Sequence, residues 1–211
     1  MLNRKIIILF GLLLLVSGSS TTYGFSKGSL EIRLSHSNPL SRKIESNVKK
    51  MNLLSLDFIA NCQGPITLRQ FTLVDDGTGT ANDFSAIYAS IGHSVKTHPA
   101  GIDAKNRTVT LRFLSPLVVP ECKRVQVDIL VDVASSIPQG STHSLAIELP
   151  SDIISNVDGV YGNFPIRSQV FTVRENRADK VRCYRKAGSA ESGSERREAR
   201  ALCRRTKIDL P

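Results

Sequence analysis

The chain of 211 residues has no tryptophan, only two methionines and an aromatic content of 6%. Aromatic platforms for stacking nucleic-acid bases are therefore scarce. An excess of positive charge is also missing from most of the chain. Residues 25–173 carry 14 Lys and Arg against 13 Asp and Glu, whereas residues 174–211 carry 12 against 6. The formal net charge of +9 thus arises mainly from the C-terminal end, and we expect no specific recognition of nucleic acid.

The sequence also lacks patterns that mark common active sites and metal centres. No serine stands in a convincing catalytic-triad context, and the four cysteines are too far apart for the paired spacing of structural zinc. We therefore predict that the chain is not an enzyme and needs no cofactor. Asp75, Asp76 and Asp83 flank a Gly-Thr-rich loop and could offer oxygen ligands to calcium. Since the regular spacing of an EF-hand is missing, a plain hairpin loop is the favoured interpretation.

One long apolar run is present, near the N-terminus. Residues 6–16 are apolar, Arg4 and Lys5 precede them, and small residues follow. This layout is typical of a secretory signal peptide, and the run is shorter than the roughly 20 residues that span a bilayer. We predict a signal peptide over residues 1–24, so that the protein is secreted or exposed at the cell surface and meets the membrane only transiently. An uncleaved anchor is the alternative.

Alternating apolar residues dominate the region that follows. In residues 124–133, Val125, Val127, Ile129, Val131 and Val133 form a stripe with period two, which predicts a half-buried antiparallel strand. In residues 66–74 the apolar phase changes between Leu68 and Phe71, and this change predicts a β-bulge. Turn signals recur between such segments, and no helical period of useful length occurs before residue 174. Residues 25–173 are therefore predicted to be one all-β antiparallel sandwich.

Residues 174–211 differ in composition from the predicted sandwich. Apolar residues are few and charge is dense, which predicts a short basic tail, helical or disordered. Such a tail either only improves solubility or attaches the protein to an anionic surface. The candidate surface-attachment residues are Arg182, Arg185, Lys186, Arg196, Arg197, Arg200, Arg204 and Arg205.

The even number of cysteines in an exported chain predicts disulfide bonds. The four residues are Cys62, Cys122, Cys183 and Cys203, and they allow three pairings. Cys62 follows one predicted strand and Cys122 precedes another. If these strands are antiparallel neighbours, the two cysteines lie at the same end of the sandwich and can bond, which leaves the tail cysteines to each other.

The order of segments within residues 28–173 resembles an immunoglobulin-like module of bacterial exported surface proteins. The segments that carry this resemblance are GSLEIRLSHSNPLSRKI, LLSLDFIA, ITLRQFTL, DDGTGTANDFSAIYAS, RTVTLRF, VPECKRVQVDILVDV, THSLAIELPSDI and GNFPIRSQVFTV. The resemblance implies an immunoglobulin-like β-sandwich with a structural or binding role. In such modules a Pro-Ala-Gly turn is usual where this chain has VPEC with Cys122.

The predicted function is that of a non-enzymatic, exported structural or interaction module. Its rigid sheets would present loops 75–83 and 92–106, or a sheet edge, to a partner. The partner would be a protein or a cell-envelope polymer. The alternative is a secreted binder of carbohydrate or of an anionic envelope polymer that uses the sandwich loops and the basic tail.

Overall fold

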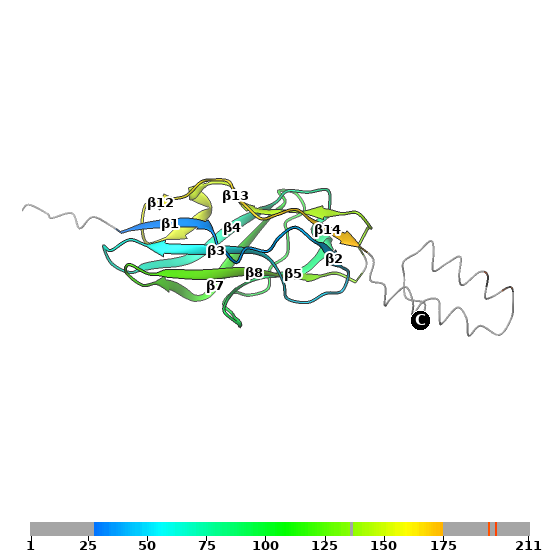
Figure 1. Cartoon of the computed structure of the whole chain (residues 1–211), viewed down its shortest axis with the longest axis horizontal. Coiled ribbons are helices and arrows are strands. Elements are labelled where there is room, and N and C mark those ends of the chain that lie inside the picture. Colours follow the sequence, from blue (N-terminus) through cyan, green and yellow to red (C-terminus); the bar gives the residue numbers. More distant parts are fainter. Residues whose placement is uncertain (1–27, 136, 175–193, 195–196, 198–211) are drawn as a thin grey trace, which may run out of the picture.

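The computed structural model describes residues 28–135 and 137–174, together with Ser194 and Arg197. Residues 28–174 form an elongated β-sandwich, in which β1 begins near one end of the long axis and β14 ends near the other (Figure 1). Ser194 and Arg197 are helical and exposed. No helix among the described residues is long and apolar enough to span a membrane.

Two sheets form the layers of the sandwich. The first, called here the β3 sheet, has the order β12 (Gly159–Tyr161), β1 (Ser29–Leu34), β3 (Met51–Ala60), β8 (Arg124–Val133), β5 (Phe84–Ile91) and β6 (Ser94–Val95). The second, the β4 sheet, has the order β11 (Ile153–Ser155), β4 (Ile66–Asp75), β10 (Leu145–Ile147) and β13 (Ile166–Arg167), and β7 (Thr108–Val119) also pairs with β4.

A small third sheet lies at the end of the sandwich where β14 ends. It contains β2 (Lys43–Glu45), β14 (Phe171–Arg174) and β9 (Thr142–His143). Two short 3-10 turns, η1 (Ala81–Asp83) and η2 (Pro150–Asp152), complete the fold. The predicted all-β sandwich is confirmed, with one correction: β1 pairs in parallel with β12, and β14 with β2. Both parallel pairs join segments that are more than 100 residues apart, since parallel pairing needs a long connection.

The core lies between the two layers and follows from the alternation in the sequence. On β8, Val127, Ile129, Val131 and Val133 are fully buried, as the period-two stripe predicts. Phe71 of the β4 sheet connects the layers, because its ring lies 6.0 Å from Phe58 and 5.8 Å from Phe113. The predicted bulge is also present, since the register between β4 and β7 shifts between Leu68 and Gln70.

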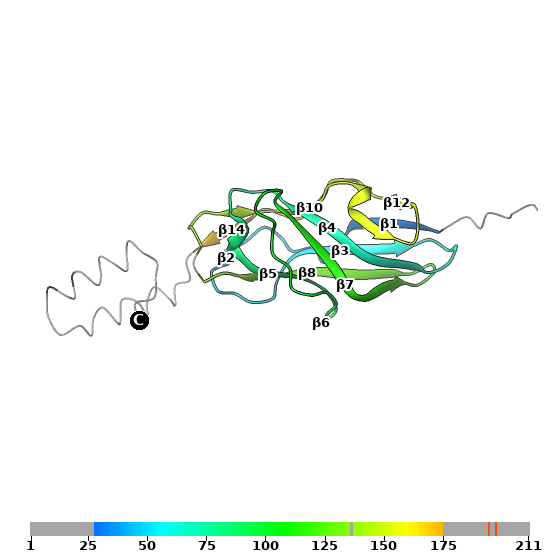
Figure 2. The ribbon, with the colours of Figure 1, turned by 180° about the vertical axis from the view of Figure 1, so that it is seen from behind.

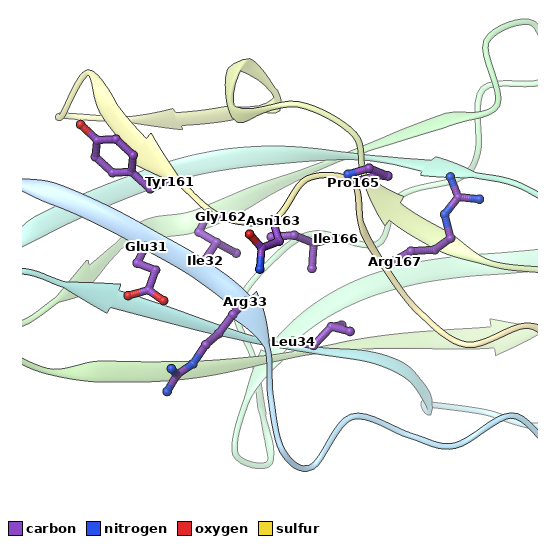
Figure 3. Close-up of a pocket in the computed structure, with 10 residues that line it drawn as sticks. All are labelled: Glu31, Ile32, Arg33, Leu34, Tyr161, Gly162, Asn163, Pro165, Ile166 and Arg167. Atoms are coloured by element: carbon purple, nitrogen blue, oxygen red, sulfur yellow. The ribbon is translucent and has the colours of Figure 1, made fainter.

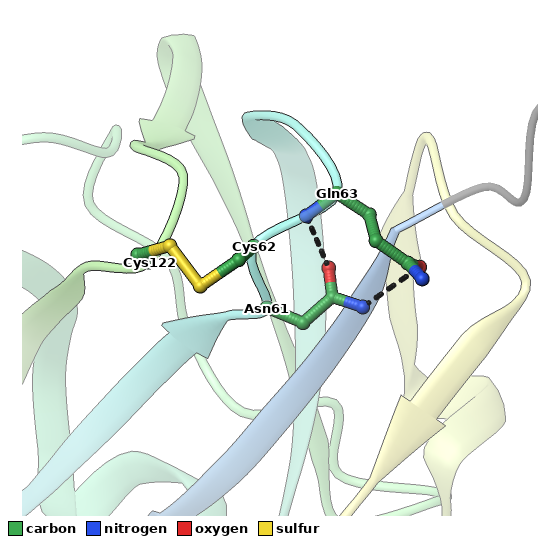
Figure 4. The surroundings of a disulfide bond; sticks show 4 residues. All are labelled: Asn61, Cys62, Gln63 and Cys122. Atoms are coloured by element: carbon green, nitrogen blue, oxygen red, sulfur yellow. Dashed lines mark hydrogen bonds between the residues drawn. A yellow bond between two sulfur atoms is a disulfide. The ribbon is translucent and has the colours of Figure 1, made fainter.

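A disulfide joins two loops at one end of the sandwich. Each of these loops, one between β3 and β4 and the other between β7 and β8, connects one layer with the other. β3 and β8 are antiparallel and pair Ile59 with Arg124, so the residues beyond these positions meet. Cys62 and Cys122 bond there with a Cα–Cα distance of 4.6 Å (Figure 4). In the same loop the Asn61 side chain accepts a hydrogen bond from the Gln63 amide and donates one to the Gln63 side chain (Figure 4). Both cysteines are exposed, as expected of a bond formed between surface loops.

Candidate functional site

Loop 75–83, predicted to be a presented hairpin loop, instead crosses from the β4 sheet to the β3 sheet and packs onto His143. The Gly79 amide donates a hydrogen bond to the Thr142 carbonyl, and the Thr78 hydroxyl lies 3.0 Å from that of Thr142. A Cβ at Gly79 would lie 2.1 Å from Cε1 of His143. Gly79 therefore has a structural role and is buried, whereas Gly77 and Thr78 stay exposed.

His143 lies at the centre of a buried charge cluster that sequence reasoning missed. The ring is fully buried, with Nδ1 3.0 Å from Oδ2 of Asp75 and Nε2 3.0 Å from Oδ2 of Asp83. Arg107 donates to the Asp75 carboxylate at 2.6 Å and to the Gly79 carbonyl at 2.6 Å. Both ring nitrogens can donate only when the imidazole is doubly protonated. In that form two cations balance two carboxylates, and the cluster is neutral.

The three Asp residues that could offer ligands to calcium instead pair with different residues of the protein. Asp75 pairs with Arg107 and His143, whereas Asp76 pairs with Arg167 on β13. Burial raises the pKa of Asp83, but hydrogen bonds from Thr80 and His143 outweigh burial and hold this pKa below its ordinary value of 3.8. No group of carboxylates, His and Cys suited to a metal ion is found among the described residues.

Loop 92–106, the second predicted loop, is partly packed between β5 and β7. Ala100 bridges to Ile87 and Thr97 bridges to Phe113, while Ile102 is buried. The exposed parts include the turn at Gly92 and His93, between β5 and β6, and residues 103–106 before β7. Both predicted loops are thus partly packed and partly exposed, but neither carries an exposed large apolar side chain. The faces and edges of the sheets, where such side chains lie, are the stronger candidates.

The outer face of the β4 sheet is the stronger candidate for contact with a protein. We call it the β7 face and define it by the exposed Leu114 and Val118 of β7, Ile154 of β11, and the arginines Arg69 and Arg112. Figure 2 brings β7 to the near side of the molecule. The apolar side chains are 54%, 52% and 45% exposed, respectively. Asp75, which is buried, is the one acidic residue of β4, β7 and β11.

The edge of β7 is protected against pairing with another strand. The backbone N–H and C=O of Thr67 both bond to Asn156, on the side of β4 away from β7. Val118 is paired with Thr67 without hydrogen bonds, so its own N–H and C=O groups point away from β4, toward the open edge. Pro116 lies two residues before it on the same edge and has no N–H group, and the Leu114 amide already bonds to the Lys96 carbonyl. Such features are typical of edges that avoid strand addition. The side chains of β7 are therefore better candidates than its backbone.

A groove of about 850 Å³ runs along β1, between β1 of the β3 sheet and residues 161–167, which lead to β13 of the β4 sheet. Ile32, Leu34 and Ile166 supply its apolar part, and the polar residues Glu31, Arg33, Asn163 and Arg167 line it together with Tyr161 (Figure 3). The ladder between β1 and β12 ends at Glu31 and Tyr161, which leaves the edge of β1 beyond that point without a strand partner among the described residues. The alternation in the sequence predicts β1 but gives no sign of this groove, because its second wall comes from residues 161–167.

The predicted attachment residues are described only in part. Arg197 is exposed and helical. The others, Arg182, Arg185, Lys186, Arg196, Arg200, Arg204 and Arg205, lie outside the described residues, as do Cys183, Cys203 and the predicted signal peptide.

No known protein family and no curated protein matches this sequence. Among solved structures, a family 123 glycoside hydrolase from Clostridium perfringens matches with a TM-score of 0.42 and 9% identity over 74% of this chain and 32% of its own. The seventh ScaB type I cohesin from Pseudobacteroides cellulosolvens matches with a TM-score of 0.33 and 13% identity over 70% and 94%. AvmM, which catalyses macrocyclization in alchivemycin A biosynthesis, matches with a TM-score of 0.32 and 9% identity over 72% and 90%.

These matches correct one prediction. The absence of a catalytic motif predicted that the chain is not an enzyme. Enzymes are among the solved structures that match, so this exclusion does not hold. The physical reason is that function depends on residues placed on a fold, and a sandwich carries catalytic and non-catalytic sites alike.

Proposed function

We propose that this chain is an exported protein-interaction module that binds its partner through the β7 face. The proposal includes a signal peptide at residues 1–24, a sandwich at residues 25–173 and a basic tail at residues 174–211. The exposed Cys62–Cys122 bond supports export, because disulfides persist in oxidising compartments and are rare in the cytosol.

The observation that carries the proposal is the exposure of Leu114, Val118 and Ile154 beside two arginines. Each apolar side chain leaves about half of its surface in water, at a cost that burial against a partner would remove. Arginine and apolar anchors are frequent at the centres of protein interfaces. Since the outer face carries Arg69 and Arg112 and no carboxylate from its strands, the fitting partner presents an apolar patch with acidic residues around it.

Site-specific photocrosslinking tests this function. Val118 in the full chain is replaced by p-benzoylphenylalanine, and the protein is irradiated with the secreted and surface proteins of the producing cells. We expect one partner to be crosslinked at position 118. The matched control places the same crosslinker at Lys43, an exposed residue of β2 in the third sheet. Equal crosslinking at both positions would contradict the proposal.

The purified partner then allows a quantitative test. We expect Val118→Glu to weaken binding by about tenfold or more, because it buries a charge in the apolar centre. Arg112→Glu should mainly slow association and reduce its dependence on salt. Unchanged affinity of both variants would place the interface elsewhere.

A further inference from the structure

The outer face of the β3 sheet carries a row of polar side chains across three strands. Asp57 of β3 is paired with Arg33 of β1 on one side and with Gln126 of β8 on the other. Although Asp57 points outward, it is fully buried. Oδ2 of Asp57 lies 3.3 Å from Arg124 and 3.8 Å from Arg33, whereas Oδ1 has no hydrogen-bond partner among the described residues. A buried acceptor without a partner is destabilising and is rare in native proteins.

The two guanidinium groups next to Oδ2 of Asp57 are only loosely held. The side chains of Arg33 and Arg124 are 49% and 52% exposed, and Asp57 is the one ionic partner of each within the described part of the chain. The rest of the row is held in place, because Gln126 donates to Asp128 at 2.9 Å and accepts from Ser35 at 3.1 Å. A ligand that displaced one guanidinium would therefore meet a fixed acceptor on a rigid sheet.

An exposed aromatic ring lies on the same face. Tyr161 of β12 is paired with Glu31 of β1, two residues before Arg33, and is 62% exposed. Its ring lies over Gly159, where an added Cβ would be 3.1 Å from Cε2 of the ring. Tyr161, Glu31 and Arg33 follow one another along the groove (Figure 3). Arg33 thus belongs both to the groove and to the row that contains Asp57.

The charges of the four ionic side chains in the row and beside Tyr161 balance, and Arg167, elsewhere in the groove, is paired with Asp76 and Glu148. Glu31 and Asp57 supply two carboxylates, and Arg33 and Arg124 supply two guanidinium groups. A charged ligand would gain little net attraction from them. Carboxylates only accept hydrogen bonds and guanidinium groups only donate them, whereas a hydroxyl group does both. A neutral ligand with several hydroxyl groups therefore matches the surface better than an ion does.

We propose that Tyr161, Glu31, Arg33, Asp57 and Arg124 form a binding site for a neutral saccharide. A sugar hydroxyl donates to Oδ1 of Asp57 and accepts from Arg33 or Arg124, and the C–H face of the sugar ring packs on Tyr161. Tyr161, Glu31 and Arg33 line the groove of about 850 Å³, which falls within the usual size range of small-molecule sites, and Asp57 lies beside it through its pairing with Arg33. This site uses strands rather than loops or the basic tail. It lies on the opposite layer from the β7 face, so it is independent of the proposed protein partner.

A glycan array tests the site with the full-length protein, using printed neutral oligosaccharides and uronate-bearing oligosaccharides of similar length. We expect binding to neutral glycans that persists at high salt. The best neutral oligosaccharide is then titrated calorimetrically against variants. Tyr161→Ala and Asp57→Asn should each weaken binding by about tenfold or more, since one removes the ring and the other the acceptor charge.

Matched variants keep the test specific. Tyr161→Phe retains the ring and should retain most of the affinity, and Arg112→Ala, on the β7 face, should not change it. Thermal melting of each variant shows whether the fold is kept. Three results would overturn the proposal: no neutral glycan is bound, affinity is unchanged in Tyr161→Ala, or the uronate-bearing glycans bind best and are released by salt. None of these results bears on crosslinking at Val118.

Discussion

Two buried carboxylates, Asp57 and Asp75, show how differently one residue type can be used in this molecule. Both are fully buried, and each has one oxygen without a hydrogen-bond partner among the described residues. Asp75 lies under a packed loop, 2.6 Å from Arg107 and 3.0 Å from His143. Asp57 lies on a sheet face, with its closest cation 3.3 Å away on a half-exposed side chain.

The two carboxylates differ in how well neighbouring cations and hydrogen-bond donors compensate their buried negative charge. A buried charge is tolerated when it is paired closely and hydrogen-bonded. Asp75 meets this condition through residues that are themselves fixed, so we interpret its cluster as structural. Asp57 meets it only loosely, so a ligand could improve its environment. Four variants or conditions test this contrast, from the largest expected effect to the smallest.

Replacing His143 should have the largest effect. In His143→Ala, the carboxylates of Asp75 and Asp83 lose their shared imidazole partner while both stay buried. We expect the free energy of unfolding to fall by about 3–5 kcal/mol, as when one partner of a buried ion pair is removed. Urea denaturation measures the change, with His98→Ala, which alters an exposed histidine, as the control. If the free energy of unfolding fell by less than about 1 kcal/mol, the cluster around His143 would not be what holds loop 75–83 in place.

Adding a methyl group at Gly79 should have a smaller effect. Its Cβ would lie 2.1 Å from Cε1 and 2.2 Å from Nε2 of His143, so the loop must move away from the cluster. We expect Gly79→Ala to lower stability by about 1–3 kcal/mol, as overpacking does. Gly101→Ala is the matched control, because a Cβ there meets nothing within 4 Å. Equal stability of the two variants would contradict the close packing of loop 75–83.

Acid should weaken the cluster through Asp83. Because the folded state holds the pKa of Asp83 below 3.8, the carboxylate contributes stability above that pH. This contribution is lost as the pH falls through the lower pKa of the folded state. We expect the unfolding free energy of Asp83→Asn to depend less steeply on pH below 3.8 than that of the native chain. An identical slope in Asp83→Asn and in the native chain would show that Asp83 has no part in the acid response.

Asp57→Asn should have the smallest effect on stability. The substitution removes a buried charge that is poorly compensated. Arg33 and Arg124 lose their ionic partner, but both side chains are about half exposed, so water solvates them. We expect the free energy of unfolding to change by less than about 1 kcal/mol. Calorimetric melting of this variant beside Asp75→Asn gives the direct comparison. A large loss in Asp57→Asn would mean that its row is structural, like the cluster at His143.

The strands and the bulge were accessible from the sequence because each depends on neighbours along the chain, whereas the Cys62–Cys122 bond was only one of the pairings left open. Alternation in residues 124–133 reports which side of a strand is buried, and the phase change between Leu68 and Phe71 reports an extra residue. His143 gave no such signal. It lies in a two-residue strand, and its partners are 60 and 68 residues away along the chain.

The groove along β1 was hidden from the sequence for the same reason, since residues 31–34 and 161–167 meet only after folding. Loop 75–83 was misinterpreted because a Gly-Thr-rich stretch between two strands does not reveal whether they share a sheet. Here β4 and β5 belong to different layers, so the loop must cross the end of the sandwich and pack there.

The sequence by itself determined the all-β architecture and the buried face of each long strand, because side-chain alternation is a local property of the chain. It left three cysteine pairings open, and the pairing of β3 with β8 in the folded sheet selected Cys62 and Cys122. Only the tertiary structure decided that Asp75 is paired under a loop while Asp57 is left half-compensated on a sheet. The environment of a carboxylate depends on charges brought to it from distant strands, and no local pattern records their distance.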